Sequence, residues 1–127
     1  MNAQNHNRFL RPVLVVEDEL FIGLDVAEEL ESRGFAVYGP ISNVESASKV
    51  VDTYHFSAAV LDFRLQDGNS HILAERLQEK NVPVIFYTGN PEEAARHPVA
   101  RHATLLSKPA MGSEIADAVA EVAVATA

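Results

Sequence analysis

The chain has 127 residues, of which 47% are hydrophobic and 22% are charged, and its net charge is −8. These values are typical of one globular domain, and no apolar run approaches the roughly 20 residues that span a bilayer. The negative charge argues against non-specific binding to nucleic acids or anionic membranes, and the absence of cysteine excludes disulfides and thiolate chemistry.

The N-terminal segment is polar and is expected to form a flexible tail over residues 1–11. It lacks the apolar core of a signal peptide, so we expect a cytoplasmic protein. No linker or change of composition interrupts the rest of the chain. We therefore expect residues 12–127 to form one domain, without an attached output domain.

Apolar runs that resemble strands alternate with segments of helical periodicity. The predicted strands cover residues 12–16, 35–38, 58–61, 84–87 and 104–106. The helices between and after them are expected to bury one apolar face each. These predicted faces are Leu20, Leu24, Ala27 and Leu30; Val44, Ala47 and Val51; Ile72, Leu73 and Leu77; and Ile115, Val119 and Val122.

Turn and cap residues mark the ends of several elements. Gly39-Pro40 is expected to end the second strand. Ser42 with Glu45 three residues later matches a capping box, which predicts Ser42 as the N-cap of the second helix. Asn90 is expected to begin the fourth helix, and Pro98 cuts that helix short.

This alternation predicts an α/β fold with a parallel sheet and helices on both faces. The short connections require right-handed crossovers. Five strands fit the flavodoxin-like (βα)5 doubly wound arrangement, in which the strand order is 2-1-3-4-5. In that order the carboxyl ends of the first and third strands flank the crevice where such sheets bind ligands.

Chemically useful side chains follow four of the predicted strands. Glu17, Asp18 and Glu19 follow the first, Asp62 the third, Thr88 the fourth and Lys108 the fifth. Taken singly, the acids could cap a helix, the threonine could belong to a turn, and the lysine could be a surface residue. Their coincidence at the ends of neighbouring strands favours one shared site.

The clustered acids determine the chemistry expected of this site. Two like charges about 4 Å apart repel by about 4 kcal/mol at an effective dielectric constant near 20. A hard divalent cation such as Mg²⁺ would offset this repulsion. With the cation, Lys108 and the hydroxyl of Thr88 would surround a phosphoryl group, and Asp62 could serve as its nucleophilic acceptor.

Four motifs in this order resemble the receiver domain of two-component response regulators. They are Val-Leu-Val-Val-Glu-Asp-Glu (13–19), Leu-Asp-Phe-Arg-Leu (61–65), Tyr-Thr-Gly (87–89) and Ser-Lys-Pro (107–109). The resemblance runs from the first strand to the last helix. It also implies a cis peptide bond before Pro109.

The resemblance implies a role for each site residue. Asp62 would be the phosphoacceptor, and Asp18, Asp62 and the backbone carbonyl of Arg64 would ligate Mg²⁺. Glu17 would act on the metal mostly through water. Thr88 and Lys108 would contact the phosphoryl oxygens.

Some positions depart from the family pattern. Residues 82–89 resemble a single-domain subgroup with a Phe-Ala-Thr-Gly motif, but Tyr87 replaces its alanine and Asn90 the aromatic residue that follows. Leu105 stands where many receivers carry an aromatic switch residue, so we hypothesise that Tyr87 replaces it. Arg64 is hypothesised to change the phosphoryl lifetime, the alternative being a pair with a surface acid.

The leading hypothesis is a stand-alone response regulator that accepts a phosphoryl group from a sensor histidine kinase. It would signal by binding a partner, by phosphorelay or as a phosphate sink, as a monomer or weak dimer without nucleic-acid or membrane partners. It would not be an enzyme beyond its own phosphorylation and dephosphorylation. The alternatives are a receiver-like adaptor that takes no phosphate and an aspartate-based phosphatase, although Arg64 occupies the place of the second acid of such phosphatases.

The five histidines show no metal-ligand spacing. His97 and His102 are expected at the surface.

Overall fold

The computed structural model describes residues 11–123, so the predicted tail, apart from Arg11, lies outside the described residues. Its centre is a five-stranded parallel sheet in the order β2-β1-β3-β6-β7. The predicted order is thereby confirmed. The strands are β1 (Val13–Val16), β2 (Val37–Ile41), β3 (Ala58–Leu61), β6 (Val84–Thr88) and β7 (Ala103–Ser107).

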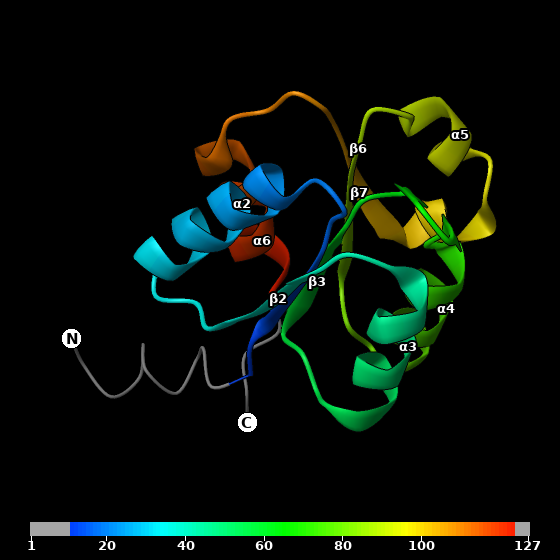
Figure 1. The fold of residues 1–127 in the computed structure, drawn as a ribbon, viewed down its shortest axis with the longest axis horizontal. Helices are drawn as coiled ribbons and strands as arrows, with labels where there is room; N and C mark the ends of the chain where they lie inside the picture. Colours follow the sequence, from blue (N-terminus) through cyan, green and yellow to red (C-terminus); the bar gives the residue numbers. More distant parts are fainter. Residues whose placement is uncertain (1–10, 124–127) are drawn as a thin grey trace.

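Helices cover both faces of the sheet (Figure 1). Helices α2 (Leu20–Ser32) and α6 (Gly112–Val122) lie on one face, and α3 (Val44–Thr53) and α4 (His71–Glu79) on the other. Between residues 11 and 123, no helix is long and apolar enough to cross a membrane. The shorter elements are β4 (Arg64–Leu65), β5 (Gly68–Asn69), α5 (Pro91–Ala95) and the 3₁₀ helix η1 (Pro98–His102).

The core has two halves because strand side chains alternate between the faces. Leu14 and Leu61 belong to the half beneath α3 and α4, whereas Val13 and Val60 belong to the half beneath α2 and α6. Strands β1 and β3 are buried along their whole length. This is why they are apolar at every position rather than at every second one.

The predicted buried faces of two helices are wrong in part. Leu20 and Leu24 are 59% and 45% exposed, and Ile72 is 50% exposed. The rest of these predicted faces is confirmed: Ala27 and Leu30 of α2 and Leu73 and Leu77 of α4 are buried. Gly23 and Val26 complete the buried row of α2, and Ala74 completes that of α4.

Strand β2 does not end at Gly39-Pro40 as predicted but continues to Ile41. A proline is tolerated because β2 is an edge strand. The Gly39–Pro40 bond is cis, and the pairing register with β1 shifts between Leu14 and Val16. The backbone amide of Glu17 donates to the carbonyl of Ile41 at 2.8 Å, so the end of β2 positions the first residue of the acidic pair.

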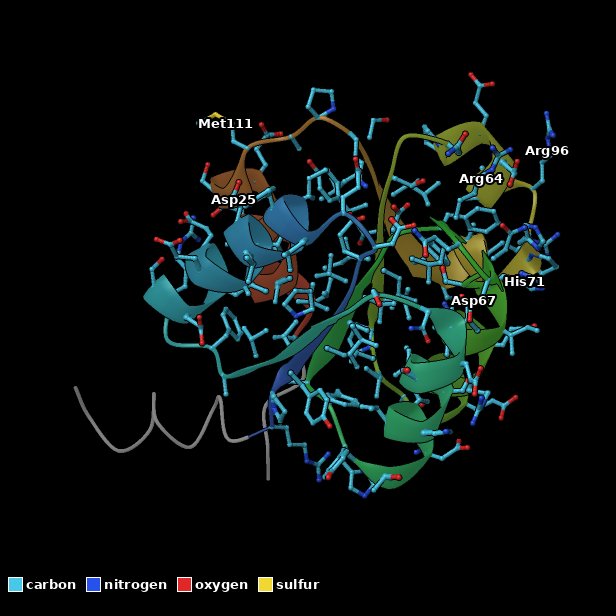
Figure 2. All side chains as sticks on the ribbon, viewed as in Figure 1. Asp25, Arg64, Asp67, His71, Arg96 and Met111 are labelled. Atoms are coloured by element: carbon cyan, nitrogen blue, oxygen red, sulfur yellow. The ribbon has the colours of Figure 1, made fainter. Side chains whose placement is uncertain are left out.

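The start of α3 differs from the prediction. Its N-cap is Asn43 rather than Ser42, and the Asn43 side chain accepts a hydrogen bond from the amide of Ser46 at 2.8 Å. The Asp67 carboxylate, in the turn between β4 and β5, accepts from the amides of Val44 at 2.8 Å and Glu45 at 3.0 Å (Figure 2). These bonds lower the pKa of Asp67. A sequence pattern could not reveal this cap because it comes from a distant segment.

Other expectations are confirmed. Helix α5 has Asn90 as its N-cap and is only five residues long. Pro98 begins the separate η1 helix. The Lys108–Pro109 peptide bond is cis.

Gly39 offers a test of the close approach of β2 to β1. Its φ angle is +121°, and a Cβ atom there would lie 2.4 Å from the carbonyl oxygen of Val15. We expect Gly39→Ala to reduce the free energy of unfolding by about 2 kcal/mol or more, measured by urea denaturation. Gly89→Ala is the control, since a Cβ atom at residue 89 would meet no atom within 4 Å. Equal stability of the two variants would contradict this packing.

Candidate functional site

The predicted site residues meet at the carboxyl edge of the sheet. Val16 of β1 pairs with Leu61 of β3, so Glu17 and Asp62, which follow them, are neighbours. Thr88 pairs with Ser107, which places Lys108 directly beyond the end of β6. The convergence expected from the strand order is therefore observed.

Lys108 forms the electrostatic centre of the cluster. Its Nζ atom lies 2.7 Å from Glu17 Oε1, 2.9 Å from Asp62 Oδ2 and 3.2 Å from Glu19 Oε2. An ammonium group has three protons, so each carboxylate can accept one. Lys108 is therefore held on three sides, and only 14% of its side chain is exposed.

Glu19 is expected at the same sheet edge but has no assigned role in the predicted metal or phosphoryl site. It occupies the N-cap position of α2, but its side chain makes no cap hydrogen bond and pairs with Lys108 instead. The available signal was a third acid directly after the first strand. An acid there is equally compatible with helix capping, so the sequence could not decide between these roles.

Glu17, Asp18 and Asp62 each place a carboxylate oxygen within 4.8 Å of the others. Glu17 and Asp62 are buried, and Asp18 is partly exposed. All of these donor atoms are oxygens, as a hard cation such as Mg²⁺ requires. The side chains present therefore fit a magnesium ion.

Burial and charge oppose each other at Glu17. Desolvation by burial raises the pKa of this carboxyl from 4.5 to about 7, although hydrogen bonds from Lys108 and from the backbone of Glu19 act in the opposite direction. Burial lowers the pKa of Lys108, but its hydrogen bonds to Glu17 and Asp62 outweigh this effect and raise that pKa overall. Lys108 thus does not fully offset the desolvation of Glu17.

The backbone around Asp62 is fixed by hydrogen bonds. Its amide donates to the carbonyl of Val16 at 2.9 Å, and the buried hydroxyl of Ser70 donates to its carbonyl at 2.7 Å. The amide of Ser70 also donates to the carbonyl of Phe63 at 2.8 Å. Ser70 was not predicted, because its position eight residues after Asp62 forms no recognisable pattern. These contacts hold the carboxylate at the strand end.

Thr88 is fully buried, and its hydroxyl oxygen accepts a hydrogen bond from the amide of Asn90 at 3.0 Å. A hydroxyl that accepts still has its own proton to donate. Beside it, Gly89 leaves open space. A groove of about 510 Å³ begins there and is lined by residues 89–93, Arg96, Ser107 and Lys108.

The Arg64 side chain lies beside helix α5 (Figure 2). It forms an ion pair with Glu93 of that helix. Arg64 Nε donates to Glu93 Oε1 at 3.1 Å, and its NH2 group contacts Oε2. Both side chains are partly exposed, and the pair lowers the pKa of Glu93. The predicted alternative, a pair with a surface acid, is therefore the arrangement observed.

Tyr87 and Leu105 lie on opposite faces of the sheet. Tyr87 belongs to the core beneath α2 and α6, whereas Leu105 packs against the core beneath α3 and α4. The Tyr87 hydroxyl donates to the carbonyl of Ala110 at 3.3 Å and accepts from its amide at 3.0 Å. Tyr87 thereby holds the segment that follows Lys108, whose Nζ lies 5.6 Å from the Tyr87 ring centroid.

His97 is not at the open surface as predicted. It is partly buried and stacks on His71, with ring centroids 4.5 Å apart, and its ring lies 5.1 Å from that of Phe63. This contact joins α4 to the end of α5 and depends on tertiary structure, so local sequence could not predict it. His102 is exposed, as expected.

Comparison with known proteins agrees with this geometry. The family model for the response regulator receiver domain matches residues 13–120. The phyllosphere-induced regulator PhyR of Methylorubrum extorquens strain AM1 is 32% identical over 100 residues, which represent 76% of this chain and 38% of PhyR. The chain therefore spans less than half the length of this relative.

Two solved structures share the fold. A response regulator receiver protein from Sinorhizobium medicae WSM419 gives a TM-score of 0.80 at 23% identity, with 88% of this chain and 93% of that chain covered. The receiver domain of sensor histidine kinase PA1611 from Pseudomonas aeruginosa PAO1 gives 0.74 at 19% identity, with 88% and 96% covered. It is described with a magnesium ion coordinated in its active site cleft.

Asp18 provides a test of charge repulsion in the cluster. Lys108 pairs with its neighbours Glu17 and Asp62, so the charge of Asp18 adds to the cluster without taking part in these ion pairs. We expect Asp18→Asn to raise the metal-free unfolding free energy by about 1 kcal/mol and to weaken Mg²⁺ binding. Urea denaturation and magnesium titration measure these effects. Glu31→Gln is the control, because it removes one charge from the exposed side of α2. A destabilised metal-free Asp18→Asn protein would count against clustered repulsion.

The raised pKa of Glu17 predicts a pH dependence of stability. Between pH 4.5 and about 7 the folded protein binds more protons at Glu17 than the unfolded chain does. This group therefore makes the metal-free protein less stable as pH rises through that window. In wild type, the free energy of unfolding should fall by an amount on the order of 2 kcal/mol across this pH window because of Glu17, and Glu17→Gln should lack this fall. Urea denaturation of both metal-free proteins at several pH values measures the difference. If the unfolding free energies of the two proteins changed with pH in parallel, Glu17 would not be the source of the pH dependence.

Proposed function

The chain belongs to the response regulator receiver domain family, and on this premise we propose that Asp62 accepts a phosphoryl group from a sensor histidine kinase in a Mg²⁺-dependent step. The observation that carries the proposal is that three carboxylates and Lys108 meet at the carboxyl edge of the sheet. Receiver domains are generally signalling switches rather than enzymes in the ordinary sense. We assign this chain the same role.

The proposed magnesium ligands are Asp18, Asp62 and the backbone carbonyl of Arg64, with Glu17 acting mostly through water. The oxygen donor set and the incompletely compensated charge at Glu17 support this assignment. The magnesium described for the PA1611 receiver domain supports it further. When bound, the ion neutralises negative charge on the acids and on the phosphoryl group.

The proposed reaction is an in-line displacement. A carboxylate oxygen of Asp62 forms a bond to phosphorus, and the phosphorus–nitrogen bond of the donor phosphohistidine breaks. The bonding electron pair leaves with the imidazole nitrogen. The Asp62 oxygen loses its negative charge as the acyl phosphate forms, and the phosphoryl group brings its own charge into the site.

Lys108 and Thr88 are proposed to stabilise the phosphoryl oxygens. Lys108 already donates to Asp62, so a small movement of its ammonium group would transfer one hydrogen bond to the adjacent phosphoryl group. The Thr88 hydroxyl can donate its proton because its contact with Asn90 uses only a lone pair. Its buried position and the space beside Gly89 support this role.

The signal is proposed to leave the site through α5. This helix directly follows Thr88 and Asn90, has five residues and buries Ala94. A movement of Thr88 toward the phosphoryl group would disturb its bond with Asn90 and hence the start of α5. The pair of Arg64 with Glu93 links the same helix to the segment after the phosphoacceptor.

The output is proposed to be binding of a downstream protein, phosphorelay or action as a phosphate sink. Residues 12–127 would supply the receiver domain, as a cytoplasmic monomer or weak dimer without nucleic-acid or membrane partners. A phosphatase function is disfavoured because Arg64 stands in place of a second acid and its side chain contacts Glu93.

Asp62→Asn tests the phosphoacceptor. With Mg²⁺ and acetyl phosphate, wild type should gain the mass of one phosphoryl group, and beryllium fluoride should raise its thermal stability. The variant should lose the mass change completely, because an amide is not a comparable nucleophile. Circular dichroism verifies its fold. A wild-type protein that responds to neither reagent would instead be an adaptor that takes no phosphate.

A further inference from the structure

We propose that Glu19 is a positioning residue that retains Lys108 and thereby weakens the hold of the site on a phosphoryl group. The inference rests on the proposed function of Asp62. It assigns a role to a residue that belongs neither to the proposed metal ligands nor to the proposed phosphoryl contacts. Glu19 is thus a competitor for the lysine and not itself a catalytic residue.

The geometry distinguishes Glu19 from the other partners of Lys108. Its carboxylate lies 3.2 Å from Nζ and is 63% exposed, whereas those of Glu17 and Asp62 lie closer and are nearly buried. Glu19 is also the one of these three acids that the proposed magnesium site does not use. Its contact with Lys108 is therefore the easiest of the three to exchange.

Phosphorylation changes the balance among these partners. Once Asp62 carries the phosphoryl group, its bonded oxygen has no negative charge and attracts Lys108 less. Glu17 lies next to the proposed magnesium ion, which offsets its charge. Glu19 keeps its full charge, so it and the phosphoryl oxygens compete for the same ammonium protons.

The backbone of Glu19 is already held in place for this contact. Its φ and ψ angles are −87° and 105°, and its amide donates to Glu17 Oε2 at 3.1 Å. Its side chain leaves the start of α2 uncapped, although an acid is favourable at a helix N-terminus. Loss of Lys108 would therefore leave this carboxylate beside a helix end that attracts it, which makes the exchange less costly.

Two substitutions separate contact from charge. Glu19→Gln removes the charge and keeps the length of the side chain. Glu19→Asp keeps the charge but is one methylene shorter, so it cannot hold the same contact without moving the backbone. Glu28→Gln is the matched control, since Glu28 is an exposed acid of α2 outside the pairs of Lys108.

The test measures the affinity of each protein for beryllium fluoride at saturating Mg²⁺, by NMR titration. We expect Glu19→Gln and Glu19→Asp to bind about two- to fivefold more tightly than wild type, the range typical of one exposed ion pair. Glu28→Gln should match wild type. Before the ligand is added, the Lys108 ammonium signal should be shifted in both Glu19 variants and unshifted in the control.

Each contrary result has a distinct meaning. Wild-type affinity for beryllium fluoride in both Glu19 variants would overturn the proposal. If their unfolding free energies fell at the same time, the pair of Glu19 with Lys108 would contribute only to the stability of the fold. Tighter binding by Glu19→Gln and Glu28→Gln alike, with Glu19→Asp equal to wild type, would assign the effect to net charge and also overturn it. If the wild-type protein did not bind beryllium fluoride at saturating Mg²⁺, the proposed function would be overturned as well.

Discussion

The sharing of one lysine ammonium group among three carboxylates holds this edge of the molecule together. Glu17 follows β1, Asp62 follows β3, Glu19 begins α2, and Lys108 joins them from the end of β7. Without a cation, each close pair of acids would repel by about 4 kcal/mol at an effective dielectric constant near 20. The surrounding structure fixes the lysine: its amide donates to the carbonyl of Thr88, and Tyr87 holds the segment that follows it.

The same arrangement leaves the buried Glu17 carboxylate incompletely compensated. The pKa of Glu17 lies near neutrality because burial outweighs the help of its hydrogen bonds. A protein that needed only stability would be better served by apolar residues here, since buried charges are costly even when paired. The acidic cluster suits the binding of a cation, which connects the electrostatics of the site to the proposed phosphotransfer.

Much of this could be predicted from the sequence because parallel strands impose a simple rule. The buried strands β3 and β6 are almost wholly apolar, so their ends are easy to locate, and Asp62 and Thr88 stand at those ends. Lys108 follows the partly exposed edge strand β7. What could not be predicted depends on tertiary contacts. Helix α2 has two apolar rows, and only packing shows that Leu20 and Leu24 lie on the exposed one. The partners chosen by Glu19 and Arg64 likewise depend on segments distant in sequence.

The Asp67 cap connects the loop after Asp62 to the start of helix α3. Two amide protons of α3, those of Val44 and Glu45, are protected by a carboxylate that travels with the β4–β5 hairpin. A movement of that hairpin away from α3 breaks both hydrogen bonds and exposes these amides to water. The hydrogen-exchange rates of these two amides therefore report how often the contact between the loop after Asp62 and the start of α3 opens, without any change to the chain.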